Sequence, residues 1–280
     1  MPDIQILIAA YGRDSLKRIA NLRHPQVSGV EYVVGWQRHD MQAIPRELLE
    51  RKDFRIVFEN STGLCNNRNS LLDIAEADIA VISDDDLEYT PQQLDNIRNS
   101  FIEHPDCHFL TFRYVSQDYP KFYPDHSFDL KNPPKGYFVT SMEMAFNMKK
   151  IRKEGLGRAL RFNPAFGVNG DFFGSCEEDI VVADILRSGF KGIFIPKDIC
   201  INTDSTTSER IGHTREFIET KGASMLHVKP ISWPLRMLSH ARRASAAGGR
   251  NHISFMQYCR WWLAGCRKAR KHKVFAYVEG

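Results

Sequence analysis

Three features are scarce or missing in this sequence of 280 residues, and each absence excludes a class of protein. None of the cysteines forms a Cys-x-x-Cys pair or shows a matching histidine spacing, which excludes a zinc module and a disulfide framework. No apolar run approaches the roughly 20 residues of a membrane-spanning helix, and no basic stretch precedes the short apolar run at residues 6–10. We therefore expect a cytoplasmic protein with six reduced thiols, at Cys65, Cys107, Cys176, Cys200, Cys259 and Cys266.

Acidic residues are absent from residues 220–278, which hold 12 of the 38 Lys and Arg but none of the 34 Asp and Glu. The remainder of the chain is therefore acidic, although the formal net charge is +4. We predict a catalytic domain over residues 1–215 and a basic amphipathic helical extension over residues 216–280. Such a tail is expected to face an anionic surface, either phospholipid or nucleic acid.

The composition, with 42% hydrophobic and 11% aromatic residues, is enough for a large core. Apolar runs of strand length alternate with segments that have helical periodicity, which predicts an α/β fold with a mostly parallel sheet flanked by helices. In such sheets ligands bind at the carboxyl ends of the strands. The expected strands are 4–10, 32–34, 54–58, 79–83 and 108–115, and the expected helices include 16–22, 44–51, 64–75 and 90–103.

Three consecutive acids, Asp84, Asp85 and Asp86, end the apolar run at residues 79–82. Side chains alternate along an extended strand, so Asp84 and Asp86 are expected to point the same way and to chelate a divalent ion. A cation would also offset the repulsion between the carboxylates. The alternative is a solvated acidic turn, because aspartate is common in turns.

A second acidic cluster, Glu177, Glu178 and Asp179, precedes a helical pattern that ends at Gly189. These acids are expected in the first turn of a helix, where they could simply complement the helix dipole. The preceding stretch, 162–173, is rich in glycine and aromatic residues and is typical of a shaped loop. In that setting one of the carboxylates could act as a general base.

Several short motifs, in this order, resemble the family 2 glycosyltransferases of the GT-A (Rossmann-like) fold over roughly residues 3–205. They are Tyr11 after the first strand, Gly63-x-x-x-x-Arg68-Asn69, Asp84-Asp85-Asp86, and Phe173-Gly174-x-x-x-Glu178-Asp179 followed by Gly189-Phe190-x-x-Ile193. The resemblance implies an inverting, metal-dependent, hexosyltransferase-like enzyme. It would move a sugar from a nucleotide-diphosphate donor to a hydroxyl acceptor in surface glycan or lipid-linked oligosaccharide synthesis.

The resemblance also implies roles for particular residues. Asp179, with Glu178, would be catalytic, and Mn²⁺ or Mg²⁺ would bind to Asp84, Asp86 and His213. The nucleotide-binding residues would be Ala9, Tyr11, Arg13, Arg68, Asp84 and Asp85. Two alternatives stay open: a nucleotidyltransferase, for which the Tyr11-Gly12-Arg13 loop is a poor phosphate cradle, and a catalytically silent protein that binds a nucleotide or nucleic acid.

One further helix is expected in the tail, over residues 254–271. Its apolar stripe holds Phe255, Tyr258, Cys259, Trp262, Leu263 and Cys266. This stripe can pack on the rest of the protein, or it can lie in an anionic membrane interface as a basic amphipathic helix. We expect the second, which would make the protein peripheral on the inner face of the membrane. The match of Gln257, Arg260 and Trp261 to a Gln-x-x-Arg-Trp motif is expected to be accidental.

Overall fold

The computed structural model describes residues 3–38, 44–116, 120–203, 214–246 and 253–276. The chain forms two compact units. The sheet unit comprises Met1–Thr62, Asn66–Arg161 and Asp184–Ser205, and the helical unit comprises Gly63–Cys65, Phe162–Ala183 and Thr206–Gly280. The predicted boundary after residue 215 stays a prediction, but residues 162–183 group with the C-terminal helices.

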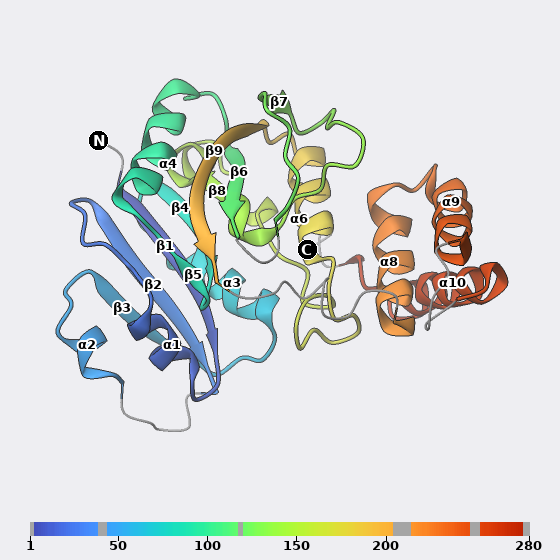
Figure 1. The fold of residues 1–280 in the computed structure, drawn as a ribbon, viewed down its shortest axis with the longest axis horizontal. Coiled ribbons are helices and arrows are strands. Elements are labelled where there is room, and N and C mark those ends of the chain that lie inside the picture. Colours follow the sequence, from blue (N-terminus) through green and yellow to red (C-terminus); the bar gives the residue numbers. More distant parts are fainter. Residues whose placement is uncertain (1–2, 39–43, 117–119, 204–213, 247–252, 277–280) are drawn as a thin grey trace. The chain divides into compact units, whose positions relative to one another are not determined.

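The sheet unit is built on one sheet with the strand order β3-β2-β1-β4-β8-β6-β9-β5, and β7 also pairs with β9 (Figure 1). The strands are β1 (Ile4–Tyr11), β2 (Val30–Gln37), β3 (Phe54–Glu59), β4 (Ile79–Asp84), β5 (Leu87–Glu88), β6 (Phe109–Val115), β7 (Phe128–Asp129), β8 (Met144–Asn147) and β9 (Gly192–Asn202).

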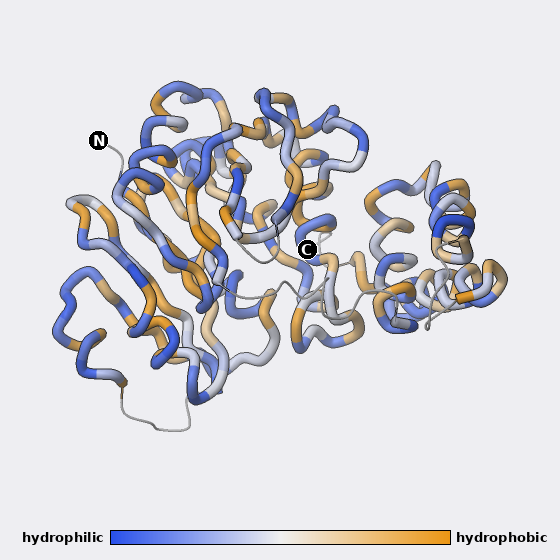
Figure 2. Tube along the Cα trace, in the orientation of Figure 1, coloured by the Kyte–Doolittle hydropathy of each residue, from blue (hydrophilic) through white to orange (hydrophobic). Residues whose placement is uncertain are grey.

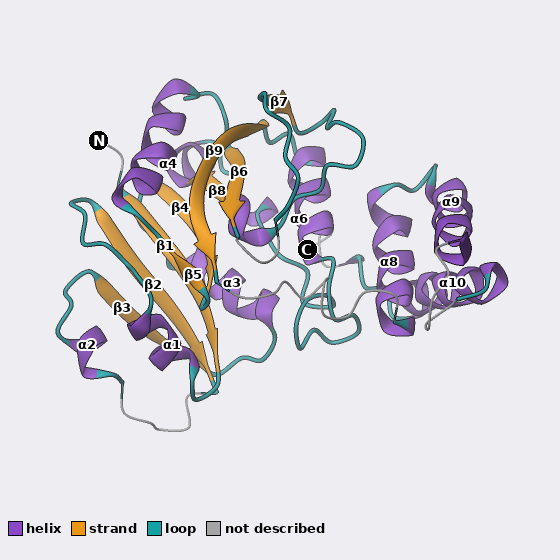
Figure 3. Ribbon diagram, viewed as in Figure 1, coloured by secondary structure: helices purple, strands orange, loops and turns teal. Residues whose placement is uncertain are grey.

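Helices connect the strands in the alternation that the sequence predicts (Figure 3). They are α1 (Ser15–Asn21), α2 (Arg46–Leu49), α3 (Leu64–Asp73), α4 (Pro91–Glu103), α5 (Met148–Lys153) and α6 (Glu177–Arg187), with the 3₁₀ turns η1 (Ser141–Glu143) and η2 (Gly157–Ala159). Strands β1 to β4 pair in parallel, whereas β8 pairs antiparallel with both β4 and β6. The α/β fold is confirmed, with a sheet that is parallel in its N-terminal half and mixed beyond β4.

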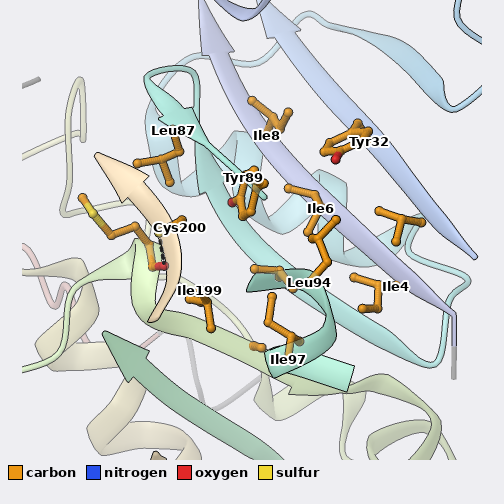
Figure 4. Packing of buried hydrophobic residues seen from close by; sticks show 14 of the residues in the cluster. Ile4, Ile6, Ile8, Tyr32, Leu87, Tyr89, Leu94, Ile97, Ile199 and Cys200 are labelled. Atoms are coloured by element: carbon orange, nitrogen blue, oxygen red, sulfur yellow. Dashed lines mark hydrogen bonds between the residues drawn. The ribbon is translucent and has the colours of Figure 1, made fainter. Parts of the chain in front are cut away.

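The core explains why residues 6–10 of β1 form an unbroken apolar run. A parallel strand between two neighbours is buried on both faces, so its sequence need not alternate with polar residues. Ile4, Ile6 and Ile8 belong to the same buried cluster as Leu94 and Ile97 of α4 (Figure 4). Hydrophobic residues are accordingly frequent along the central strands (Figure 2).

Helix α4 begins where the sequence predicts, and its cap shows why. Thr90 adopts an extended backbone and its side chain accepts a hydrogen bond from the backbone N–H of Gln93. The Gln93 side chain accepts in return from the backbone N–H of Thr90 (2.9 Å), which completes a capping box. Pro91 follows at the first helical position, where its missing N–H costs nothing.

The helical unit contains α8 (Arg215–Val228), α9 (Trp233–Ala246) and α10 (Phe255–Lys271). Glycines let α8 and α10 cross closely: a Cβ at Gly222 would strike the backbone of Trp262, and one at Gly265 would strike the backbone of Glu219. The thiol of Cys266 donates to the carbonyl oxygen of Gly222 (3.2 Å). Small residues at such crossings allow the two backbones to approach.

The apolar stripe predicted on the last helix is present on α10, but most of it is buried inside the helical unit. Tyr258, Cys259, Trp262 and Cys266 pack with residues of α8 and α9. The expectation that this stripe lies in a membrane interface is therefore wrong, because its side chains already form a core. Within the described ranges, no helix is long and apolar enough to cross a membrane.

Candidate active site

Strands β1, β2 and β4 are parallel, so their carboxyl ends meet at one edge of the sheet. Ala9 lies opposite Asp84 on one side and opposite Gly35 on the other. Tyr11 ends β1 at the same edge, where its exposed hydroxyl accepts a hydrogen bond from Arg38 (3.0 Å). The structure thus brings the predicted nucleotide-lining residues Ala9 and Tyr11 to the edge that carries Asp84.

Only the first of the three acids belongs to the extended strand, and the other two form a turn. Asp84 is the last residue of β4, and Asp85 and Asp86 form the turn before β5. The alternation expected from an extended backbone therefore stops at Asp84. Thr203 fixes the turn, because its N–H (3.3 Å) and its hydroxyl (2.7 Å) both donate to the carbonyl oxygen of Asp86.

Basic side chains also lie at this edge. Arg18 of α1 places its guanidinium 3.4 Å from a carboxylate oxygen of Asp85. Arg13 is exposed in the turn that leads from β1 to α1. Arg18 was not predicted, because helical periodicity identifies the buried face of α1 but not which strand end its polar face meets.

Arg68 is a deeply buried charged group beside the acidic turn. Its side chain is only 1% exposed, and one terminal nitrogen, Nη2, donates both to Asp84 Oδ1 and to Ser141 Oγ, each at 2.8 Å. A guanidinium in this position holds the Asp84 carboxylate in one orientation and keeps a positive charge beneath the site. Ser141, which begins η1, was not predicted, since nothing in its local sequence distinguishes it.

The segment before Ser141 is anchored by a buried acid. The Glu143 side chain is fully buried and accepts hydrogen bonds from Lys121 Nζ and Tyr123 OH, both at 2.6 Å. It also caps η1 by accepting from the N–H of Thr140 (3.2 Å). Burial, with Glu143 as a second cause, raises the pKa of Tyr123 far above its ordinary value. Lys121 and Tyr123, which lie in the loop after β6, are thereby held two residues from Ser141.

A divalent cation fits the acidic turn only with help from other ligands. Among the described residues, no group of three or more His, Cys, Asp and Glu side chains is arranged to hold a metal ion. Asp84 and Asp86 supply carboxylate oxygens, and Mg²⁺ is commonly held by one or two carboxylates together with substrate phosphates. The residues present thus suit an ion whose coordination is completed by a nucleotide. His213, the third predicted ligand, lies outside the described residues.

The second acidic cluster occupies the first turn of α6, as predicted. Its members differ in burial: Glu177 is buried, whereas Glu178 and Asp179 are partly exposed. Burial, followed by the charge of Asp179, raises the pKa of the Cys176 thiol to about 12. These three acids belong to the helical unit, and Glu178 and Asp179 are the two that solvent or a ligand can reach.

Gly167 explains the glycine-rich loop that precedes this helix. Its φ of +89° favours glycine, and a Cβ there would lie 3.2 Å from both Cys65 Sγ and the Glu177 carboxylate carbon. The Cys65 thiol donates to the carbonyl oxygen of Phe166 (3.1 Å), and the N–H of Leu64 donates to that of Val168 (2.9 Å). The loop is therefore held against residues 64–65 at the start of α3.

Part of the chain matches a known protein family, and nearly the whole chain resembles solved structures. Residues 40–168 match the family model described as Glycosyl transferase family 2. The crystal structure of S. aureus TarS 1-349 is 14% identical and covers 99% of this chain and 88% of its own, with a TM-score of 0.58. Its complex with UDP-GlcNAc gives 13% identity and a TM-score of 0.59, over the same shares of both chains.

A second solved structure is the mannosyltransferase PcManGT from Pyrobaculum calidifontis in complex with GDP-Man and Mn²⁺. It is 13% identical, with a TM-score of 0.50, over 97% of this chain and 77% of its own. No curated protein matches the chain significantly. At identities this low the similarity shows a shared fold and nothing more. It is the GT-A fold that the sequence motifs imply. Residues 40–168 therefore match the family 2 glycosyltransferases, and the chain shares the GT-A fold of these solved structures.

Proposed function

We propose that this protein transfers a hexose from a nucleotide-diphosphate sugar to a hydroxyl group with inversion, using Mn²⁺ or Mg²⁺. The observation that carries the proposal is the acidic turn at the carboxyl ends of parallel strands, with Asp84 held by the buried Arg68. A nucleotide diphosphate bound there would meet carboxylates, arginines and an exposed tyrosine. The solved relatives with UDP-GlcNAc and with GDP-Man support this class of donor.

The nucleotide-sugar donor would bind at the acidic turn. Asp84 and Asp86 would hold the cation, which when bound acts as a Lewis acid on the negative charge of the leaving diphosphate. Arg68 fixes the direction of the Asp84 carboxylate, so the site needs little reorganisation. Ala9, Tyr11 and Arg13 would line the nucleotide, with the small side chain of Ala9 leaving space beside β4.

The acceptor side would depend on Asp179, with Glu178 in a lesser role. As an acceptor hydroxyl attacks the anomeric carbon it must lose its proton, and a partly exposed carboxylate can accept it. Direct displacement of the diphosphate then inverts that carbon. Two groups of carboxylates with different tasks are required, and the chain offers two.

The proposed acceptor is a lipid-linked oligosaccharide or a surface glycan precursor, with the protein peripheral on the cytoplasmic face of a membrane. The support for this part is the stretch of residues 220–278, where 12 basic residues stand without any acid. A basic surface is attracted to anionic lipid, which would bring the enzyme to a lipid-linked substrate.

A thermal-shift screen of nucleotide diphosphates and nucleotide sugars, with and without Mn²⁺, tests the donor assignment. A ligand that binds the folded state raises the melting temperature, and we expect the largest rise when nucleotide and ion are both present. Transfer of the sugar itself, followed with a hydroxyl acceptor, then separates a glycosyltransferase from a silent nucleotide-binding protein. Release of pyrophosphate from a nucleoside triphosphate would instead favour a nucleotidyltransferase.

A further inference from the structure

Helix α9 carries apolar side chains on two faces. Its inner face packs into the core of the helical unit through Trp233, Met237, Ala241 and Ala244, which recur every three or four residues. The opposite face, about half a helical turn away, carries Leu235 and Leu238, which are 71% and 43% exposed. Ile231 stands 95% exposed in the turn just before the helix.

Arginines accompany this outer stripe. Arg242 follows Leu235 and Leu238 on the same face, and Arg236 and Arg243 lie along one border of it; all three are exposed. The hydropathy along α9 accordingly alternates between hydrophobic and strongly hydrophilic residues (Figure 2). Leucine beside arginine on one exposed face is the pattern of a helix that lies in a membrane interface.

The charged side chains of α9 and α10 are all basic. Residues 220–278 contain no Asp or Glu, so the exposed arginines of α9 have no acidic neighbours in their own helix or in α10. The pKa of His240 on α9 is lowered to about 4, first by burial and then by the charges of Arg243, Lys221 and Arg236. Positive potential at α9 therefore comes from residues of both α8 and α9.

We propose that the outer face of α9, formed by Ile231, Leu235 and Leu238 with Arg236 and Arg242, is the surface by which this protein binds anionic phospholipid. The leucines and Ile231 would enter the acyl boundary while the arginines meet the lipid phosphates. This inference names the surface for the membrane association proposed above, and it does not depend on sugar transfer.

Nucleic acid fits the same face less well. A phosphate backbone would use the arginines, but bases bind by stacking on aromatic rings or by hydrogen bonding, and the exposed apolar side chains of this face are aliphatic. A protein partner is also disfavoured, because a specific interface needs about 800 Å² on each side and this face offers three apolar side chains. Binding to a bilayer requires no such minimum contact area, and a bilayer interface accommodates aliphatic side chains and arginines together.

The test compares full-length variants in co-sedimentation with vesicles of phosphatidylcholine alone and vesicles that contain about one third phosphatidylglycerol. We expect the wild-type protein to bind the anionic vesicles and to be released as salt rises. Leu235→Gln/Leu238→Gln should weaken binding at least about tenfold, because two apolar side chains lose their burial. Arg236→Gln/Arg242→Gln should weaken it by about fivefold per charge at low salt.

Matched controls lie in the sheet unit. Leu49→Gln/Ile102→Gln removes two exposed apolar side chains, and Arg46→Gln/Lys52→Gln removes two exposed charges. Both should bind vesicles as the wild-type protein does. Nucleotide-dependent thermal shifts should be unchanged in all four variants, so failure of the membrane surface can be told from failure of the donor site.

Three results would overturn the proposal. The first is wild-type protein that does not bind anionic vesicles, and the second is a Leu235→Gln/Leu238→Gln variant that binds them as well as the wild type. The third is that Arg236→Gln/Arg242→Gln weakens binding to single-stranded RNA, whereas Leu235→Gln/Leu238→Gln changes neither RNA binding nor vesicle binding. That last result would assign the face to nucleic acid.

Discussion

Nη2 of Arg68 lies 2.8 Å from Oδ1 of Asp84, and the same nitrogen lies 2.8 Å from Oγ of Ser141. One buried cation therefore ties α3 to the end of β4 and to η1. Asp84 is 27% exposed, so the pair stands at the border between the core and the ligand side of the sheet. A change at either residue should affect stability and nucleotide binding together.

Arg68→Met should lower stability moderately and abolish nucleotide binding. It keeps much of the apolar volume but leaves Asp84 without its buried cation, and we expect a loss of about 2 kcal/mol in the free energy of unfolding, discounted for the exposure of Asp84. Nucleotide-dependent stabilisation should disappear. Arg68→Lys should fold better but bind nucleotide poorly, because a single ammonium cannot reproduce the planar guanidinium. Denaturant unfolding and thermal shifts measure both, and full nucleotide binding in Arg68→Met would contradict the role given to this residue.

Asp86→Asn tests metal binding more directly than a substitution of Asp84 does. Thr203 holds the main chain of Asp86, and that contact survives the substitution. We expect the fold to be retained and the Mn²⁺-dependent part of the nucleotide thermal shift to be lost. Asp84→Ala is a poorer choice because it also removes the partner of Arg68.

The control for this experiment is Asp106→Asn, an exposed acid in the turn before β6. It should respond to Mn²⁺ and nucleotide as the wild-type protein does. An undiminished Mn²⁺ effect in Asp86→Asn would show that the acidic turn does not hold the ion.

Asp179→Asn should bind donor and metal almost normally and lose transfer. The amide keeps the shape of the side chain but cannot accept the proton of the acceptor hydroxyl, so the defect should appear in turnover. Glu178→Gln should be milder. If these acids only complement the dipole of α6, Asp179→Asn would cost up to about 1 kcal/mol of stability and leave turnover near native. Turnover and melting temperature measured on the same variant decide between the two.

Gly265→Ala should destabilise the helical unit. The added methyl would meet the backbone of Glu219 on α8, which can move only if the two helices separate. We expect a loss of about 1–3 kcal/mol in the free energy of unfolding. Gly174→Ala, where nothing lies within 4 Å of the added atom, is the matched control and should change little. Equal stability of the two variants in denaturant would argue against a tight α8–α10 crossing.

His24 should make stability depend on pH. Burial among Tyr32 and Phe54 lowers its pKa from 6.5 to about 4. Above pH 6.5 the residue is neutral in both states; between 6.5 and about 4 only the unfolded state binds the proton, so stability falls as pH falls. When the pH falls from 7.5 to 5, His24 should lower the free energy of unfolding by about 2 kcal/mol. The His24→Gln variant should lack that part of the pH dependence, and an unchanged slope would exclude His24 as its source.

The sequence by itself determined the elements whose signals are local. The apolar runs of β1 and β4 predict buried strands because a parallel strand is covered on both faces. Thr90, Pro91 and Gln93 fix the start of α4, since a cap is made by residues adjacent in the chain. The position of Asp84 at a strand end, and of Asp179 in the first turn of a helix, followed from the same local patterns.

Only the tertiary structure decided which distant residues meet. Periodicity shows that α10 has an apolar stripe but not whether lipid or α8 covers it, and close packing at Gly222 and Gly265 settled that in favour of α8. The contact of Arg68 with Ser141 joins residues far apart in the chain, and no local pattern encodes it. The turn at Asp85 and Asp86 likewise depends on Thr203, which arrives from the far end of β9. Such contacts arise because the folded chain must pair buried polar groups wherever partners are brought together.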